Sequence, residues 1–217
     1  MSADRWAYEK KARAAGHLTV AGIDEAGRGP LAGPVVAAAV ILPNGFPSAE
    51  VNDSKQLSPV QRDSLYEVIY THAVAVGIGI VDPVEIDRIN ILRASLLAMA
   101  MAALNLAPKP DCLLIDGTFP IPLRVVQHTI AKGDALSLSI AAASIVAKVT
   151  RDRLMGRYDQ EYPQYGFAGH KGYATQAHRK AICRHGCCPI HRRSFKGVKE
   201  FTARPTARQL PLTAGDG

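Results

Sequence analysis

The sequence lacks any apolar run long enough to cross a membrane. No segment of the 217 residues reaches the roughly 18 unbroken apolar residues that a membrane-spanning helix needs. The longest apolar stretch, 95–107, is interrupted by Asn105 and predicts a buried helix instead. The first residues are polar and no apolar run precedes a small-residue cleavage site, so we expect no secretory signal. These absences predict a soluble, cytoplasmic protein that does not act in a membrane.

Cysteine is also scarce, with Cys112 followed by a group near the C-terminal end. Adjacent cysteines rarely bridge to each other, so reduced thiols in a cytoplasmic setting are the simplest interpretation. Because His185 and His191 lie near the group, a zinc site stays open as the weaker alternative. The Cys-x2-Cys spacing of zinc sites is absent. The grouped cysteines are Cys183, Cys187 and Cys188.

Positive charge is scarce in the first two thirds of the chain and abundant in the last third. Residues 1–147 carry 12 Lys and Arg against 14 Asp and Glu, a net charge of −2. Residues 148–217 carry 14 against 5, a net charge of +9. Such a segment forms either a basic surface that serves solubility or a surface that follows a phosphate backbone. Charge alone does not distinguish the two.

Alternating apolar runs and capped helical patterns predict an α/β domain. The order of the elements suggests a mixed five-stranded sheet flanked by helices, with a helical extension at the C-terminal end. The 83–106 helix divides into two pieces near Asn90, and residues 27–30 predict a tight hairpin connection. We expect strands at 18–23, 34–42, 73–81, 112–116 and 124–130, and helices at 2–15, 58–72, 83–106, 137–161 and 175–184.

Four carboxylates, Asp24, Glu25, Asp116 and Asp134, lie at or just beyond the ends of apolar runs. A half-sheltered carboxylate must be paired, protonated or bound to a metal ion. If the four converge, cations must neutralise them, and hard oxygen ligands of this kind suit Mg²⁺ or Mn²⁺. Two such ions support in-line hydrolysis of a phosphodiester. Taken singly, Asp116 and Asp134 are as readily explained as turn or cap residues.

The adjacent acids Asp24 and Glu25 precede the glycines Gly27 and Gly29, which flank Arg28. Two neighbours on a strand point to opposite faces, so we expect only one of the acids to face a site unless the backbone turns. Glycines let a ligand approach the backbone closely and leave its N–H groups free to donate. A single Gly-x-Gly is weak evidence, since no dinucleotide or P-loop spacing follows it.

The run of residues 22–30, Gly-Ile-Asp-Glu-Ala-Gly-Arg-Gly-Pro, resembles the signature of bacterial ribonuclease HII. The resemblance covers about residues 18–201 in the same order. It continues through Asn52-Asp53-Ser54-Lys55, Leu114-Ile115-Asp116-Gly117, Lys132-Gly133-Asp134, the 139–145 and 147–152 segments, His170-Lys171-Gly172-Tyr173 and His191-Arg192-Arg193-Ser194-Phe195. The combination of motifs is highly specific for the type 2 ribonuclease H family.

The resemblance implies a ribonuclease H-like fold and an endonuclease that cuts 5′ of a ribonucleotide, leaving a 3′-hydroxyl and a 5′-phosphate. The implied substrates are RNA–DNA hybrids and duplex DNA with single ribonucleotides. It assigns two metal ions and the catalytic role to Asp24, Glu25, Asp116 and Asp134. It assigns recognition of the 2′-hydroxyl to Gly27, Arg28, Gly29 and Tyr173, and phosphate contacts to Ser54, Lys55 and Lys148. For Tyr173, a partly buried loop aromatic is the alternative without the resemblance, and for the lysines it is a solvated surface charge.

We therefore expect an N-terminal helical segment (1–17), a catalytic core (18–160), a helical and basic extension of the same domain (161–201), and a flexible tail (202–217). Arg192 and Arg193 either extend the basic face or pair with acidic side chains. A single-domain nuclease needs no partner subunit, which predicts a monomer.

Two places depart from the family pattern. Cys187-Cys188-Pro189 replaces a polar loop, for which the sequence offers no functional account. The tail segment Gln209, Leu210, Pro211 and Leu212 resembles the start of the motif that binds the bacterial sliding clamp, but Thr213 occupies its aromatic position. A tail without a partner is the alternative that these residues favour.

Two other functions remain open from the residues. One is a nuclease or integrase of the same broad fold without preference for RNA. The other is a non-catalytic protein that binds nucleic acid through the basic last third.

Overall fold

The computed structural model describes residues 4–47 and 58–202, and its centre is a five-stranded sheet. Strands β1 to β3 are antiparallel neighbours, whereas β1, β4 and β5 run parallel. The spatial order is β3-β2-β1-β4-β5, which confirms the predicted mixed sheet. The strands are β1 (Val20–Ala26), β2 (Val35–Ile41), β3 (Ala75–Val81), β4 (Cys112–Asp116) and β5 (Val126–Ile130).

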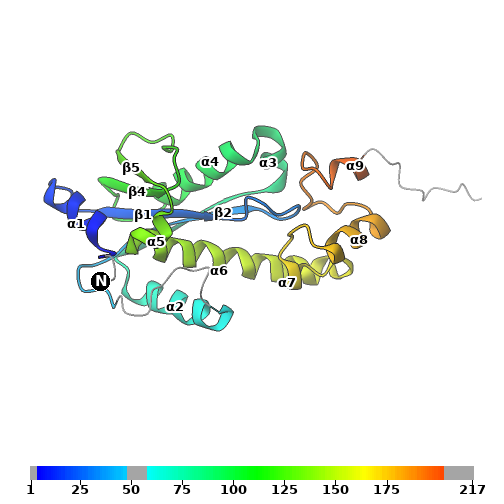
Figure 1. The fold of residues 1–217 in the computed structure, drawn as a ribbon, viewed down its shortest axis with the longest axis horizontal. Helices are drawn as coiled ribbons and strands as arrows, with labels where there is room; N and C mark the ends of the chain where they lie inside the picture. The colour runs from blue at the N-terminus through cyan, green and yellow to red at the C-terminus, as the bar shows by residue number, and fades with distance from the viewer. Residues whose placement is uncertain (1–3, 48–57, 203–217) are drawn as a thin grey trace, which may run out of the picture.

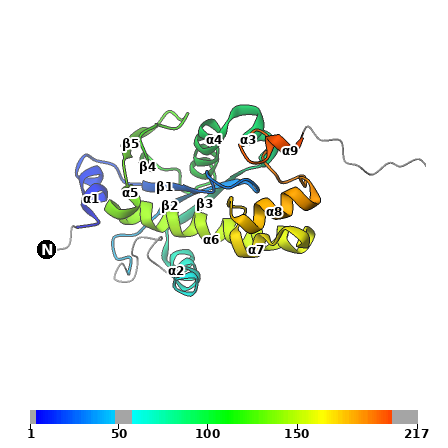
Figure 2. The same ribbon diagram turned by 45° about the vertical axis from the view of Figure 1, so that its right-hand side comes forward.

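Helices cover both faces of the sheet (Figure 1). α3 and α4 lie on one face, where apolar side chains of β1, β2 and β4 pack against α4. α6 and α2 lie on the other face and enclose a second core. The helices are α1 (Ala7–Ala14), α2 (Pro59–His72), α3 (Pro83–Ile89), α4 (Ile91–Leu104), α5 (Gly133–Leu136), α6 (Leu138–Glu161), η2 (Pro163–Tyr165), α7 (Phe167–His170), α8 (Gln176–His185) and α9 (Lys199–Thr202). Figure 2 shows α7 and α8 gathered beyond the far end of α6. Within the described ranges, no helix is long and apolar enough to cross a membrane.

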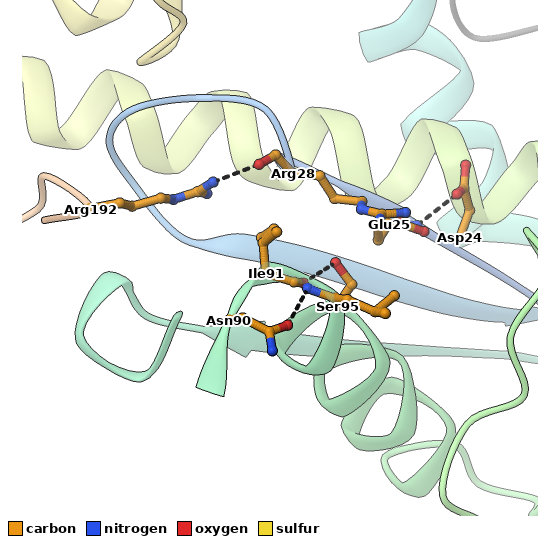
Figure 3. Close-up of polar contacts among 8 residues, drawn as sticks. Asp24, Glu25, Arg28, Asn90, Ile91, Ser95 and Arg192 are labelled. Carbon is orange, nitrogen blue, oxygen red and sulfur yellow. Dashed lines mark hydrogen bonds and ion pairs between the residues drawn. The ribbon is translucent and has the colours of Figure 1, made fainter. Parts of the chain in front are cut away.

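Side-chain caps fix where the main helices begin. The Ser58 hydroxyl accepts from the backbone N–H of Gln61, and the Ser58 N–H donates to the Gln61 side chain, which makes a capping box at the start of α2. Asn90, at φ 70°, ends α3 and accepts from the first N–H groups of α4 (Figure 3). The break near Asn90 that the sequence predicted is therefore confirmed. Ser137 caps α6 by accepting from Ile140.

Helix α1 is tied to the start of α6 by a buried carboxylate. Glu9 accepts from the Ser137 hydroxyl at 2.6 Å and from the Ser139 N–H at 2.9 Å. Negative charge is stabilised near a helix N-terminus, where backbone N–H groups lack partners in the helix. Arg5 adds a hydrogen bond at 2.8 Å to the carbonyl of Asp134. The N-terminal segment thereby fixes α5, which carries Asp134.

The end of β1 and its connection to β2 differ from the sequence prediction. We expected the strand to stop at the acidic pair, yet β1 continues through Ala26 because its backbone still pairs with β2 there. The connection to β2 spans residues 27–34 and is no tight hairpin. Its middle pairs instead with the C-terminal extension, through a bridge between Ala32 and His191. The short helices α5, α7 and α9 were also not predicted.

Glycines set the distance between the sheet and its helices. A Cβ at Gly22 of β1 would lie 2.1 Å from the backbone of Ser139 in α6. Cβ atoms at Gly77 and Gly79 of β3 would lie 2.1 and 2.0 Å from carbonyl oxygens of α4. The backbones therefore approach closely, and α6 is buried along its Ala- and Ser-rich first half. This packing holds the carboxylates of β1 against α6.

We predict that Gly22→Ala lowers the free energy of unfolding by about 3 kcal/mol or more, because α6 must move away from β1. Gly156→Ala is the matched control, since nothing lies within 4 Å of its added methyl group on the same helix. That change stabilises by about 0.5–1 kcal/mol through a less flexible unfolded chain. Urea unfolding measures both. Similar midpoints for the two variants would contradict the close packing of β1 on α6.

Candidate active site

The parallel pairing of β1 and β4 brings two carboxylates side by side. Ile23 lies opposite Ile115, so Asp24 and Asp116 are the next residues on neighbouring strands. β4 ends at Asp116, and Gly117 at φ 105° then leads the chain away. Glu25 therefore lies beyond the last paired residue of β4, where the sheet is open. This explains why both members of the acidic pair border the same cavity, although we expected only one to do so.

The cavity has a volume of about 490 Å³ and joins acidic, basic and aromatic groups. It brings together several of the predicted residues from β1, β4, α6 and the loop before α8. Ser144 and Arg151 of α6 and Arg62 of α2 also line it, although no role was predicted for these three from the sequence. The predicted residues on its wall are Asp24, Glu25, Gly27, Asp116, Lys148 and Tyr173.

Burial makes negative charge expensive at this site. It raises the pKa of Asp24 well above the usual range, and the neighbouring charges of Glu25 and Asp116 raise it further. A hydrogen bond from Ser144 opposes that rise. Burial also raises the pKa of Glu25, although Arg28 opposes it from 3.3 Å. Figure 3 shows the Arg28 side chain running back along β1 towards Glu25. A cation would relieve the remaining repulsion.

One carboxylate oxygen is available for that cation. Oε2 of Glu25 is buried and makes no hydrogen bond within the described structure. Asp116 is oriented through Oδ1, which accepts from the N–H of Gly133 at 2.6 Å. Oxygen donors of this kind fit Mg²⁺ or Mn²⁺. In the ranges described, no three His, Cys, Asp or Glu residues form a ready-made metal cluster. Asp134 is buried in α5 and is not on the cavity wall.

Gly27 is required where the chain leaves β1. It has φ 101°, and an added Cβ would lie 2.1 Å from Nε of Arg151 and 2.8 Å from the Pro34 carbonyl oxygen. Gly29 differs, because its Cβ would make only an ordinary contact with Tyr173 at 3.7 Å. Tyr173 therefore lies beside Gly29, within ordinary contact distance of any atom added there, and Tyr173 also lines the cavity.

Backbone hydrogen bonds join the loop after β1 to the C-terminal extension. Leu31 donates to Gly172 at 2.8 Å and accepts from Arg192 at 2.8 Å, while Gly33 donates to Ile190 at 2.9 Å. Arg151 donates to the carbonyls of Pro34, Ala32 and Lys171. Segments distant in sequence thus form one surface beside the carboxylates.

Arg192 has neither of the roles that the sequence left open, which were to extend the basic face or to pair with an acidic side chain. It is fully buried, and its guanidinium donates to the carbonyls of Gly33, Arg28 and Gly27. Its neighbour Arg193 is exposed, and its backbone N–H donates to Asp87. Sequence reasoning missed this role because two adjacent arginines give no sign of which one is buried.

A chain of hydrogen bonds reaches Tyr173 from the cysteine loop. The N–H of Cys188 donates to Nδ1 of His191, so Nε2 of His191 carries the proton in the neutral ring. That Nε2 lies 3.1 Å from Nε2 of His178, whose Nδ1 lies 2.9 Å from the Tyr173 carbonyl. The His191 Nε2–H therefore donates to Nε2 of His178, and the His178 Nδ1–H donates to the Tyr173 carbonyl. All four cysteines have free thiols.

Lys148 and the predicted residues outside the described ranges complete the comparison with the sequence. Lys148 faces the cavity but also pairs with Asp152 at 2.8 Å, one turn along α6. Ser54 and Lys55 lie outside the described residues, as do the tail residues Gln209, Leu210 and Leu212. The signal that could have indicated Ser144 and Arg151 was their position on the same helical face as Lys148, four residues before it and three residues after it.

Comparison with known proteins decides the family. A family model described as Ribonuclease HII matches residues 21–198. The chain belongs to that family. A Ribonuclease HII from Geobacter sulfurreducens is 57% identical over 94% of this chain and 94% of its own length. The protein is accordingly a ribonuclease H nuclease, as the resemblance predicted.

Solved structures share the fold. The ribonuclease H2 of Pyrococcus horikoshii is 28% identical with a TM-score of 0.71, covering 85% of this chain and 97% of its own. RNase HII in a PCNA:RNase HII complex from Archaeoglobus fulgidus is 30% identical with a TM-score of 0.69, covering 82% and 96%. Bst-RNase HIII in complex with Mn²⁺ is similar in fold alone, at 20% identity and a TM-score of 0.65, covering 86% and 70%. These neighbours confirm the ribonuclease H-like fold.

The buried histidine pair predicts acid sensitivity. Burial lowers the pKa of both His178 and His191 from 6.5 to about 4. Since the unfolded chain binds these protons more tightly, stability is full above pH 6.5 and is lost as the pH falls towards 4. By pH 4 the loss is on the order of 3 kcal/mol for each histidine. We expect His191→Gln to show a smaller loss over this range in thermal unfolding.

Comparing slopes isolates the histidines, because the raised pKa values of Asp24 and Glu25 act in the opposite direction in every variant. His128→Gln removes an exposed histidine from β5 and should keep the wild-type slope. A slope for His191→Gln equal to that of wild type would show that the pair is not buried neutral.

Proposed function

We propose that this nuclease hydrolyses the phosphodiester 5′ of a ribonucleotide in RNA–DNA hybrids and in duplex DNA with single ribonucleotides, leaving a 3′-hydroxyl and a 5′-phosphate. One observation carries the proposal. The buried carboxylates and Tyr173 line the same cavity, and Gly29 lies beside Tyr173, so the residues proposed to hold metal and those proposed to sense the sugar are adjacent.

Asp24, Glu25 and Asp116 would hold two Mg²⁺ or Mn²⁺ ions, with Asp134 as the fourth carboxylate. Such ions, sharing their ligands with water and phosphate, would supply the Lewis acidity for in-line attack by water. The protein itself would hold the carboxylate oxygens at fixed positions for these ions. Packing of β1 on α6 fixes Asp24, and the Gly133 N–H fixes Asp116. No side chain need act as the nucleophile.

Recognition of a ribonucleotide requires contact with its 2′-hydroxyl, which both donates and accepts hydrogen bonds. The backbone of Gly27, Arg28 and Gly29 offers polar groups at close range, and Tyr173 is 45% exposed and offers a ring to stack on the sugar. A deoxyribonucleotide would leave those polar groups without a partner, which is the strongest available basis for rejecting it.

Phosphates flanking the cut would lie along cations on the cavity wall. Lys148 is the predicted contact, and Arg62 of α2 faces the same space. Ser54 and Lys55 lie outside the described residues, and their proposed phosphate contacts rest on the resemblance alone. A positive surface beside buried carboxylates favours a phosphate backbone over a role in solubility alone.

Asp116→Asn tests the reaction. The amide keeps the oxygen that accepts from Gly133 but removes the negative charge, so the fold should persist while metal binding fails. We expect cleavage of a duplex with one ribonucleotide to fall by about 10²–10³-fold or more, as the loss of several kcal/mol of charge stabilisation implies. Gel-resolved product formation with Mg²⁺ and with Mn²⁺ measures this, and fluorescence anisotropy should show binding largely retained.

Glu85→Gln provides the matched control, because it neutralises a half-buried carboxylate that pairs with Arg88 on α3, away from the cavity. It should cleave like the wild type. Unchanged activity in Asp116→Asn would favour a non-catalytic binding protein. Equal cleavage of an all-DNA duplex by the wild type would favour a nuclease without preference for RNA.

We further propose that the tail binds a sliding clamp through Gln209, Leu210 and Leu212. The sequence resemblance supports this, and the Archaeoglobus relative was solved with PCNA. Removal of residues 208–217 should abolish clamp capture in a pull-down while leaving cleavage of short duplexes unchanged. Capture that persists after the truncation would refute the assignment.

A further inference from the structure

The Arg192 side chain packs against the buried side of the loop of residues 27–34. It is 0% exposed, and its guanidinium Nη2 donates to the Gly27 carbonyl at 2.6 Å. Nη1 donates to the Arg28 carbonyl at 2.9 Å (Figure 3), and Nε donates to the Gly33 carbonyl at 2.9 Å. Burial lowers the pKa of Arg192 to about 9, which leaves it protonated at neutral pH. The charge is therefore present and directed at backbone oxygens.

These bonds determine where the other side of each peptide points. In a trans peptide the C=O and the N–H point in opposite directions. Because the carbonyls of Gly27 and Arg28 point at Arg192, the N–H groups of Arg28 and Gly29 point away from it. Two successive N–H groups on one side form a concave donor site for an electron-rich atom. Gly27 lines the catalytic cavity and Gly29 faces Tyr173, so that side is the cavity.

We propose that Arg192 is a positioning residue for sugar selectivity, which orients the N–H groups of Arg28 and Gly29 to donate to the 2′-oxygen of a ribonucleotide. The inference rests on the proposed function and deepens it. Arg192 itself touches no substrate. Its effect passes through two peptide planes, and the side chain of Arg28 remains directed at Glu25.

The geometry requires arginine at this position. Three carbonyls are met by three different nitrogens of one planar group, which fixes their relative directions. A lysine ammonium carries its donors on a single atom and cannot reach three such oxygens with the same orientation. Arg192→Lys therefore keeps the positive charge but no longer holds the 27–28 and 28–29 peptide planes. The variant thus distinguishes an effect of peptide orientation from an effect of charge.

The first measurement is steady-state cleavage of a duplex with one ribonucleotide. We expect kcat/KM of Arg192→Lys to fall about tenfold or more, as the loss of a well-directed hydrogen bond implies. The Kd for an all-DNA duplex should stay within about twofold of the wild type, because phosphate contacts are intact. Arg192→Gln serves the same purpose if the lysine variant does not fold. A wild-type kcat/KM in the variant overturns the proposal.

A control separates positioning from general destabilisation. Ile182→Ala opens the buried cluster that Ile182 and Val198 of the extension form with Leu31, and Ile182 does not itself contact the carbonyls that accept from Arg192. It should lower the melting temperature while kcat/KM stays near the wild-type value. If kcat/KM fell as much in Ile182→Ala as in Arg192→Lys, the effect of Arg192 would be explained by stability alone, and the positioning role would be refuted.

The second measurement does not depend on activity. A crystal structure of Arg192→Lys should show the 27–28 and 28–29 peptide planes rotated, with β1 unchanged. Unrotated planes overturn the inference whatever the kinetics. If the wild type fails to prefer the ribonucleotide duplex, the proposed function fails, and the crystal structure alone decides whether Arg192 sets these planes.

Discussion

Repulsion among buried carboxylates is the constraint on which the rest of the structure depends. Asp24 and Asp116 are neighbours because two parallel strands end together, and Glu25 follows where the sheet opens. Water is largely excluded from Asp24, so its charge must be balanced by partners that the fold supplies or admits. The nearby basic groups and the capped start of α6 surround this acidic centre and hold it in one geometry.

Under the proposed function, the residues that would hold the metal ions and the residues that would recognise the substrate belong to different parts of the fold. The carboxylates are carried by β1, β4 and α5, which are fixed by sheet pairing and by α1 and α6. The surface proposed to recognise the substrate is built from loops, whose backbone carbonyls accept hydrogen bonds from Arg151 and Arg192. Buried arginines provide many of these bonds, because a guanidinium can satisfy several acceptors that a dry loop would leave unpaired.

Much of this arrangement could be predicted from the sequence. Strands and capped helices were indicated by apolar runs and by residues such as Ser58 and Asn90, because those signals are local. The convergence of Asp24 and Asp116 followed from their positions at strand ends. The burial of Arg192 could not be predicted, since its partners are carbonyls that leave no trace in side-chain identity. The extended reach of β1 was missed for a similar reason, because pairing with β2 outweighs the polarity of Glu25.

The pairing of Leu31 with Arg192 and Gly172 has a consequence for biosynthesis. The ribosome synthesises β1 early and the 190–192 segment late. The loop after β1 therefore cannot form its hydrogen bonds to that segment until most of the chain has been made. The β1–β4 pair that carries the acidic centre can close once residue 116 has emerged, well before that loop is fixed. An unfinished chain could thus assemble its catalytic acids before it can select a substrate, and selectivity would be the last property to mature.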